Sequence, residues 1–234
     1  VGLMIVPDEE TTGASAKAFL DKGYAGEFFI TSEPSNFLIG NESKGVLQFR
    51  VSFEGIAGHG SRPWQGVNAI QKAIPFIQEL TKTYPHIEEV EWKTSCNVAA
   101  IRGGDVINKI PDKCEVDVDI RYTGDDDPNE IIENLKKIAG EASVEIIAQG
   151  SHMFTDPEHP SIETLQDAAL AVLGTQLEFA QKTGSSDARF WAELGHAAIE
   201  FGPDGHGAHA LDENADVDGL LKYYELLKEY CGRL

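Results

Sequence analysis

Acidic and imidazole side chains follow several apolar runs of this 234-residue sequence. An acidic turn at residues 8–10 comes after the apolar run 1–6, Glu33 follows a second run, and His209 follows a third. Because strand ends converge at the mouth of an α/β sheet, we expect these side chains to lie close together. Adjacent carboxylates can divide the work, one binding a metal ion while the other transfers a proton. The pattern therefore indicates metal-assisted acid–base chemistry.

Each of these positions also has an ordinary structural interpretation. Taken alone, the acidic turn is more often a solvated cap of a helix, here the one predicted from Ala14 onward. Glu33 precedes Pro34, and a glutamate before proline is often only an extended, exposed residue. His209 competes with His206 for the same role, and spacing alone does not distinguish the two.

The hydrophobic pattern predicts the elements that position these residues. Residues 1–42 give a buried apolar strand at 1–6, a helix at 14–22 ended by Gly23, and a strand at 27–31. After residue 150 the same rhythm resumes, with helices at 162–173 and 187–194, a strand at 197–201 and a closing helix at about 217–230. Residues 1–42 and 151–234 are therefore expected to form one α/β domain.

Residues 43–150 have a different pattern. Alternation from Val46 predicts a half-buried strand, and further strands are expected at 96–102, 114–121 and 144–148. Helices are expected at about 67–80 and from 127 onward, although Pro75 should kink or interrupt the first. The resulting β-α-β-β-α-β order is ferredoxin-like. The predicted fold class is α/β, with a ferredoxin-like module inserted into the α/β domain.

Composition narrows the partners and the compartment. The chain has 19 Lys+Arg against 39 Asp+Glu, a formal net charge of −20, which disfavours nucleic acid and anionic membranes. Three cysteines form no disulfide framework, so a cytoplasmic location is expected. No apolar run reaches the roughly 18–20 residues of a membrane helix. The chain begins on Val1 inside an apolar run, which suggests a part of a longer polypeptide.

Five motifs carry a resemblance to a known family. They are VPDEETTG at 6–13, SEPS at 32–35, GHGSRP at 58–63, GSSDARF at 184–190 and the segment 201–213. In their order and spacing, and in the inserted module, the sequence resembles the dinuclear-zinc deacylases and exopeptidases. That family includes acetylornithine deacetylase, succinyl-diaminopimelate desuccinylase, aminoacylase and carboxypeptidase G. The resemblance covers essentially the whole chain.

The resemblance implies roles for the motif residues. Glu9 would be the general base, Glu10 and His209 ligands of one zinc ion, and Glu33 a ligand of the second, with cobalt or manganese as alternative metals. His59 would reach from the inserted module into the partner subunit's site and stabilise the oxyanion. The alternative for His59 is an ordinary turn histidine between glycines.

Three further residues are candidates for binding a substrate carboxylate: Asn108, Arg121 and Arg189. For Arg121, a structural salt bridge beside Asp117 and Asp119 is the alternative. The implied reaction is zinc-dependent cleavage of an amide bond in a small carboxylate-bearing substrate, an N-acyl amino acid or a peptide. The implied assembly is a homodimer through residues 43–150. The competing hypothesis is a noncatalytic dimerisation or ligand-binding module derived from the same family.

One departure from the family concerns the ligand set. The sequence contains neither the family's His-x-Asp ligand motif nor a later aspartate that bridges the metals. Glu10, Glu33 and His209 are fewer ligands than two zinc ions need, since even a catalytic zinc takes three protein ligands. We therefore expect this chain to be a fragment that binds metal weakly and hydrolyses poorly by itself.

Overall fold

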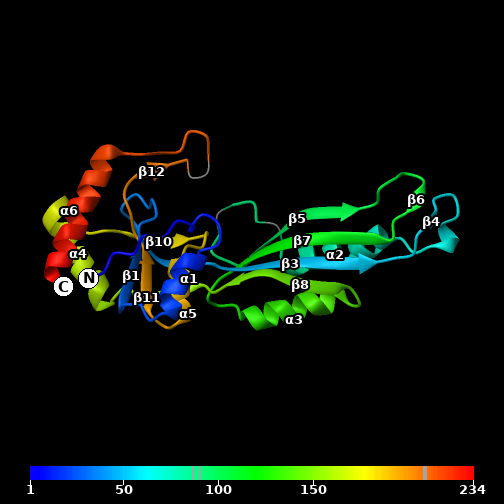
Figure 1. Ribbon diagram of the computed structural model, residues 1–234, viewed down its shortest axis with the longest axis horizontal. Helices are drawn as coiled ribbons and strands as arrows, with labels where there is room; N and C mark the ends of the chain where they lie inside the picture. The colour runs from blue at the N-terminus through cyan, green and yellow to red at the C-terminus, as the bar shows by residue number, and fades with distance from the viewer. Residues whose placement is uncertain (86, 90, 208–209) are drawn as a thin grey trace. The chain divides into compact units, whose positions relative to one another are not determined.

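The computed structural model describes residues 1–85, 87–89, 91–207 and 210–234. The chain divides into two compact units (Figure 1). Unit 1 comprises Val1–Lys44 and Ser151–Leu234, and unit 2 comprises Gly45–Gly150. Both units pack helices against a sheet, so the predicted α/β class is confirmed.

The sheet of unit 1 has a mixed topology. Strand β1 pairs in parallel with β11, which contacts β2 in the antiparallel sense, and β2 pairs in parallel with β10. A short strand, β9, also pairs with β2. The bounds are β1 Phe28–Thr31, β2 Ile39–Ser43, β9 Met153–Phe154, β10 Phe179–Lys182 and β11 Ala197–Glu200.

Helices cover both faces of this sheet (Figure 1). Ile199 of β11 packs in a cluster with α4 and α6, whereas its neighbour Ala198 packs in a separate cluster with α1 and α5. Successive strand residues point to opposite faces, so one short strand supports both layers. The helices are α1 Ala14–Asp21, α4 Pro160–Leu173, α5 Ala188–Glu193 and α6 Val217–Arg233.

Unit 2 is a four-stranded antiparallel sheet with two helices, α2 and α3, in its apolar cluster. Its strand order is β5-β7-β3-β8, which confirms the predicted ferredoxin-like module. Asp127 caps α3 by accepting the Asn129 N–H at 2.8 Å, and Pro128 occupies the first turn. The bounds are β3 Gly45–Glu54, α2 Ala69–Thr83, β5 Ser95–Gly103, β7 Lys113–Tyr122, α3 Pro128–Ala139 and β8 Ser143–Gly150.

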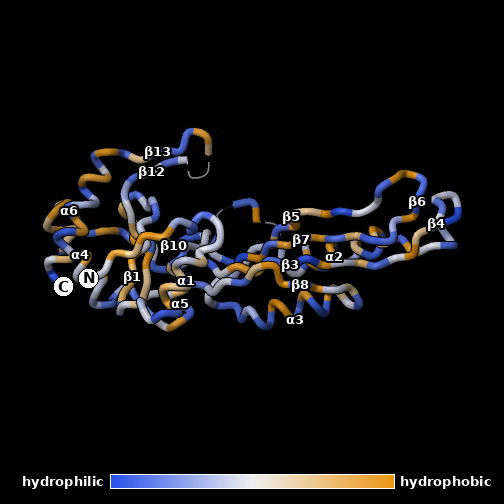
Figure 2. Tube along the Cα trace, viewed as in Figure 1, coloured by the Kyte–Doolittle hydropathy of each residue, from blue (hydrophilic) through white to orange (hydrophobic). Residues whose placement is uncertain are grey.

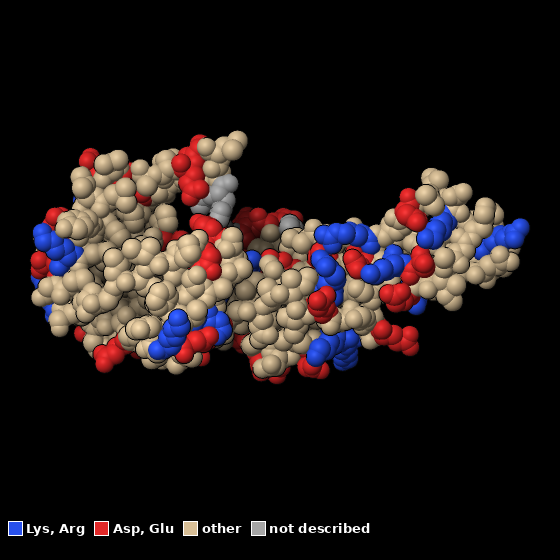
Figure 3. All heavy atoms as spheres, in the orientation of Figure 1, with Lys and Arg blue, Asp and Glu red and all other residues tan. Residues whose placement is uncertain are grey.

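Hydrophobic and hydrophilic residues alternate along the unit 2 strands (Figure 2), and the alternating burial of β3 and β7 shows that the two faces of the sheet differ in polarity. Leu47, Phe49 and Val51 of β3 are buried. On the other face, Asp117 pairs with Arg50 at 2.8 Å and with Arg102 at 2.6 Å. Hydrogen bonds from these two guanidinium groups lower the pKa of Asp117 to about 2. Figure 3 shows acidic and basic side chains interspersed on this unit.

Two expectations are wrong. Residues 1–6 form no strand; Val1, Leu3 and Ile5 are 81–92% exposed, and only Met4 and Val6 pack against a core cluster. Within the described part of the chain no strand pairs with this segment. Only one side of the segment is therefore covered by other residues, and the apolar side chains on its other side face solvent.

The helix α2 continues through Pro75. Pro75 is exposed, so water can bind the carbonyl that its missing N–H leaves unpaired. Ala73, Phe76 and Leu80 hold the opposite face of the helix in the core.

Among the described residues, no helix combines the length and the apolar character needed to cross a membrane.

Candidate active site

The acidic turn is held by Asp8. Its carbonyl oxygen accepts the N–H groups of Thr11, Thr12 and Gly13 at 3.2, 3.1 and 2.9 Å, and its Oδ2 accepts the Ser15 N–H at 3.0 Å. These contacts tie the turn to the first turn of α1 and lower the pKa of Asp8. Asp8 therefore caps the helix, the role that the sequence also allowed for the acidic turn as a whole. Its hydrogen bonds hold the turn in place, and the turn positions Glu9 and Glu10.

Two loops meet at the carboxyl ends of the parallel strands β1 and β11. Ser35 Oγ accepts the Gly202 N–H at 2.9 Å, and the Phe37 N–H donates to the Gly202 carbonyl at 3.1 Å. A Cβ on Gly202 would overlap the backbone of Glu33, so only glycine allows this approach. Glu33 is thereby fixed beside the loop that leads toward His206.

The start of α5 contributes a buried carboxylate. Asp187 is 2% exposed, and neither of its carboxylate oxygens has a hydrogen-bond partner among the described residues. A Cβ on Gly13 would overlap Asp187 Oδ1, so this carboxylate lies against the start of α1. Arg189, two residues later, donates from Nη1 to the Ser186 carbonyl at 3.0 Å and stacks on Phe190.

Five carboxyl groups of this region lie close enough to influence one another. Burial, followed by repulsion from Glu33, Asp187 and Glu10, raises the pKa of Glu9 to about 7. Burial is also the largest cause of the raised pKa of Glu33, of Asp187 and of Glu200, the last residue of β11. A group with a pKa near 7 is suited to exchange protons at neutral pH.

The charge of this cluster favours a cation. Lys182 and Arg189 partly offset the carboxylates, since each lowers a neighbouring carboxyl pKa. In the described ranges no three His, Cys, Asp or Glu side chains form a metal-binding group. His209, predicted to be a ligand, lies outside those ranges. The structure thus places Glu9, Glu10 and Glu33 near one another. The remaining predicted ligand, His209, is not among the described residues.

Two other predicted residues meet in unit 2. His59 lies on β4 (Gly58–His59), which pairs with β6 (Lys109–Ile110), and the Gly60 N–H donates to the Asn108 carbonyl at 2.7 Å. His59 Nδ1 accepts the Ser61 N–H at 3.2 Å. Because a backbone N–H only donates, Nδ1 is the acceptor and the hydrogen of the neutral ring lies on Nε2. His59 is exposed, so this Nε2–H can donate outward.

Arg121 forms a structural salt bridge, which was the alternative to a role in substrate binding. Its Nε and Nη2 bind the two oxygens of Asp119 at 2.8 and 3.1 Å. A role of Arg121 in substrate binding stays a prediction.

A match to a protein family covers much of unit 2. Residues 41–146 match the M20 model described as a peptidase dimerisation domain. The whole chain is 29% identical over 250 residues to the succinyl-diaminopimelate desuccinylase of Stenotrophomonas maltophilia (strain R551-3) and covers 66% of that protein. It is 26% identical to the enzyme of the same name from Polynucleobacter necessarius subsp. necessarius (strain STIR1), covering 65% of it. The resemblance to the dinuclear-zinc deacylases and exopeptidases is confirmed.

Solved structures show that the fold is also that of M20 peptidases. The aminopeptidase PepT from Bacillus cereus has a TM-score of 0.82 at 20% identity, over 96% of this chain and 62% of that one. The M20 family metallo-carboxypeptidase from Sulfolobus solfataricus has a TM-score of 0.72 at 16% identity, over 93% of this chain and 65% of that one. The chain thus spans somewhat less than two thirds of the length of these M20 proteins.

Sequence reasoning missed three charged residues of this carboxylate-rich site: Asp187, Glu200 and Lys182. Asp187 stands inside the quoted motif at 184–190, and Glu200 ends a predicted buried strand, so both had a usable signal. Lys182 lies on β10, a strand that the pattern did not predict. A Cβ on Gly40 would lie 2.9 Å from both Cγ and Cε of Lys182, which is too close. The lysine side chain can therefore pass Gly40 only because that residue is a glycine.

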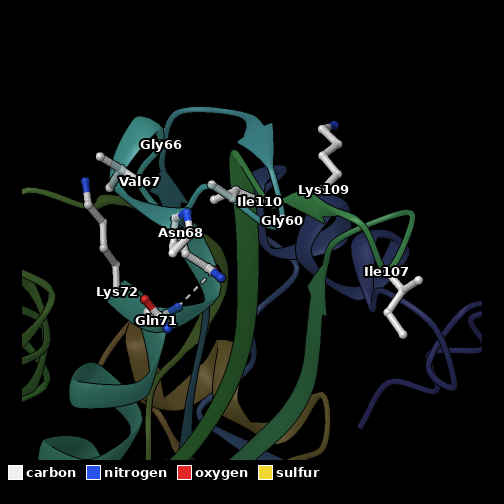
Figure 4. A pocket seen from close by; sticks show the side chains of 10 residues that line it. Gly60, Gly66, Val67, Asn68, Gln71, Lys72, Ile107, Lys109 and Ile110 are labelled. Carbon is white, nitrogen blue, oxygen red and sulfur yellow. Dashed lines mark hydrogen bonds between the residues drawn. The ribbon is translucent and has the colours of Figure 1, made fainter.

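Unit 2 also contains an open cavity of about 580 Å³ beside the strand of His59 (Figure 4). Gly60, which follows His59, and Lys109, which pairs with it, both line the cavity. The labelled residues come from β4 and β6 with their connections and from the segment that begins α2. The other lining residues are Pro63, Gly66, Val67, Asn68, Gln71, Lys72, Ile107 and Ile110.

Proposed function

We propose that this chain carries the catalytic base and the dimerisation module of a zinc-dependent amidohydrolase. Its substrate would be a small carboxylate-bearing amide, an N-acyl amino acid or a peptide. The observation that supports this most is the partly buried carboxylate cluster around Glu9, whose pKa is raised to about 7. Such a cluster is costly to bury unless a cation or a proton compensates the charge.

The donor set fits a zinc ion in chemistry and in charge. Glu10 and His209 would hold one ion and Glu33 the other, since carboxylate oxygen and neutral imidazole are zinc ligands. In the same region, the buried carboxylate oxygens of Asp187 have no hydrogen-bond partner among the described residues. Bound zinc supplies a Lewis acid that polarises the amide carbonyl and makes water more acidic.

Glu9 would act as the general base. With its pKa near 7, its carboxylate can accept a proton from the attacking water and then deliver that proton to the leaving amine. Arg189 would bind the substrate carboxylate, because its guanidinium is near enough to Glu9 to lower the pKa of that group. Asn108 and Arg121 of unit 2 are proposed to assist in binding.

His59 would stabilise the oxyanion in the site of the partner subunit. Its exposed Nε2–H is the donor that such a role requires, and Ser61 fixes the tautomer. The homodimer would form through residues 43–150, which include most of the match to a peptidase dimerisation domain. A two-fold arrangement is the simplest symmetry for such a dimer, and a cytoplasmic location is proposed with it.

Hydrolysis of N-acyl amino acids and dipeptides in zinc or cobalt tests the proposal. Only three ligands lie within these 234 residues, so we expect slow turnover by this chain and faster turnover by a longer polypeptide that contains it. Glu9→Gln should reduce either rate by at least about 100-fold. An unchanged rate in Glu9→Gln, or no hydrolysis in any preparation, would contradict the proposal.

A noncatalytic dimerisation or ligand-binding module is the second candidate. The ligands that the sequence lacks, the His-x-Asp motif and the bridging aspartate, favour it. Metal-independent dimerisation without hydrolysis in any preparation would support this second candidate, whereas a chain that sediments as a monomer at high micromolar concentration would exclude it.

A further inference from the structure

Lys182 lies over a gap in the sheet of unit 1. Its strand, β10, pairs with β2, and β2 contacts β11, so Lys182, Gly40 and Glu200 come from three neighbouring strands. The point that a Cβ on Gly40 would occupy is 2.9 Å from Cε of Lys182 and 3.1 Å from Cβ of Glu200. The lysine side chain and the base of the glutamate therefore meet on one face of the sheet, in the space that a glycine leaves free.

The pairing of the strands sets the position of this lysine. Gly40 pairs with Ala180, two residues before Lys182, so the lysine side chain runs back along its strand to lie over Gly40. The pairing shifts register just after Ala180, and irregularities of this kind redirect side chains near functional sites. The Lys44 N–H donates to the Lys182 carbonyl at 3.1 Å, which holds the backbone where the side chain begins.

The carboxyl groups beside Lys182 are costly to ionise without a cation. Glu200 is 6% exposed, and burial raises its pKa and that of Glu33. The positive charge of Lys182 acts in the opposite direction and lowers the pKa of both groups. The lysine thus supplies positive charge at the side of the cluster where a metal ion held by Glu33 would supply it. Two cations in the same small region repel each other.

We propose that Lys182 is a built-in counter-cation of Glu33 and Glu200, and that its charge opposes the binding of a metal ion at Glu33. The inference rests on the proposed function in one respect, namely that Glu33 is a metal ligand. It adds that the metal affinity of this position is set by a residue that is not a ligand.

Zinc titration of the 234-residue chain at about pH 8 tests the proposal. Lys182→Met should bind zinc at least about threefold more tightly than the wild type, because the repulsion is removed. Lys182→Arg keeps the charge and should bind like the wild type. Lys22→Met is the matched control, because it removes an exposed lysine at the end of α1. Unchanged, weaker or absent binding in Lys182→Met, or an equal gain in either of the other two variants, overturns the proposal.

Gly40→Ala displaces the lysine without removing it. The added methyl group would overlap Cγ and Cε of Lys182, so the side chain has to leave the gap. We expect zinc binding to tighten as in Lys182→Met, and Gly40→Ala to have no further effect when Lys182→Met is already present. Circular dichroism reports whether each variant folds. A further gain in the folded double variant would overturn this placement of Lys182.

A double-mutant cycle without metal separates this inference from the proposed function. In a chelator at about pH 8, Lys182→Met should lower the urea midpoint of the wild type, and should lower that of Glu200→Gln by less than half as much. Such coupling without hydrolysis in any preparation would leave Lys182 as the counter-cation and remove the enzyme. Equal shifts in the two backgrounds would overturn the role of Lys182, even in a preparation that hydrolyses its substrate.

Discussion

At the scale of single residues, Glu9 links the site to stability. Its pKa is about 7 in the folded chain against 4.5 for an ordinary glutamate, so the folded state binds its proton more tightly than the unfolded state. The stabilising contribution is therefore fully present below pH 4.5 and is lost as the pH rises through 7. Glu33, Glu200 and Asp187, whose pKa values are also raised, act in the same direction.

We predict that Glu9→Gln flattens this part of the pH profile. Urea unfolding with a chelator, at about pH 5.5 and about pH 8, should show a larger loss of stability in the wild type than in the variant. Ser32→Ala, on the same side of unit 1 but without a charge, serves as the control and should keep the wild-type difference. Identical pH dependence of wild type and Glu9→Gln would show that Glu9 titrates normally.

Residue-level prediction from the sequence was uneven for a physical reason. Glu33 is found because it follows a strand, and strand ends converge at one edge of the sheet. The acidic turn is found because it follows an apolar run, although that run forms no strand. No pattern in the sequence marks Lys182, because its position near Glu33 and Glu200 depends on the space that Gly40 leaves for its side chain. Packing of this kind is decided by tertiary contacts that no local pattern encodes.

At the scale of elements, the start of β3 depends on Gly45. A Cβ there would overlap the ring of Tyr122, which is 1% exposed and donates its hydroxyl to the Gly150 carbonyl at 3.1 Å. Gly45→Ala should therefore lower the free energy of unfolding by about 1–3 kcal/mol. Gly184→Ala, where nothing lies within 4 Å of the new methyl, should change it by less than about 0.5 kcal/mol. Equal effects in denaturant unfolding would contradict the packing at Gly45.

The helix α2 gives a prediction of the opposite sign. Pro75 is exposed within the helix, so Pro75→Ala restores an N–H for the Gln71 carbonyl without removing core contacts. The free energy of unfolding should rise by about 1–3 kcal/mol, whereas Gln78→Ala on the same exposed side should change it little. A loss of stability in Pro75→Ala would mean that the proline ring makes a contact worth more than the hydrogen bond.

Elements with strong periodicity were predicted well, and so were the short apolar strands β1 and β11, whereas short strands of mixed composition were not. The alternation in β3 and the capped start of α3 identified both elements. Strands such as β2 and β10, with four or five residues and mixed composition, lack a periodic signal and form because neighbouring strands supply their hydrogen bonds. The segment 1–6 shows the converse, because an apolar alternation without a partner strand remains largely exposed.

At the scale of the whole molecule, the account requires two subunits to complete one site. Mixing Glu9→Gln with His59→Ala protein should restore hydrolysis that neither variant has alone. Random exchange gives about a quarter of the wild-type sites, because half of the dimers are mixed and each has one complete site. The hydrolysis rate should be measured while subunits exchange, with either this chain or a longer polypeptide that contains it, depending on which of the two is active. No recovery after exchange would show that His59 does not serve the partner.

Metal binding by the carboxylate cluster of unit 1 can be measured by zinc titration with calorimetry. Wild type should bind zinc weakly, because few ligands lie in this chain. It should bind more tightly at about pH 8 than at about pH 5, because metal ligands must be deprotonated and the raised pKa of Glu33 keeps more of that ligand protonated at low pH. Glu33→Gln and His209→Ala should each weaken binding at least about tenfold, whereas His86→Ala should not. Zinc binding that is absent from the wild type, or that is unchanged in both ligand variants, would contradict the account.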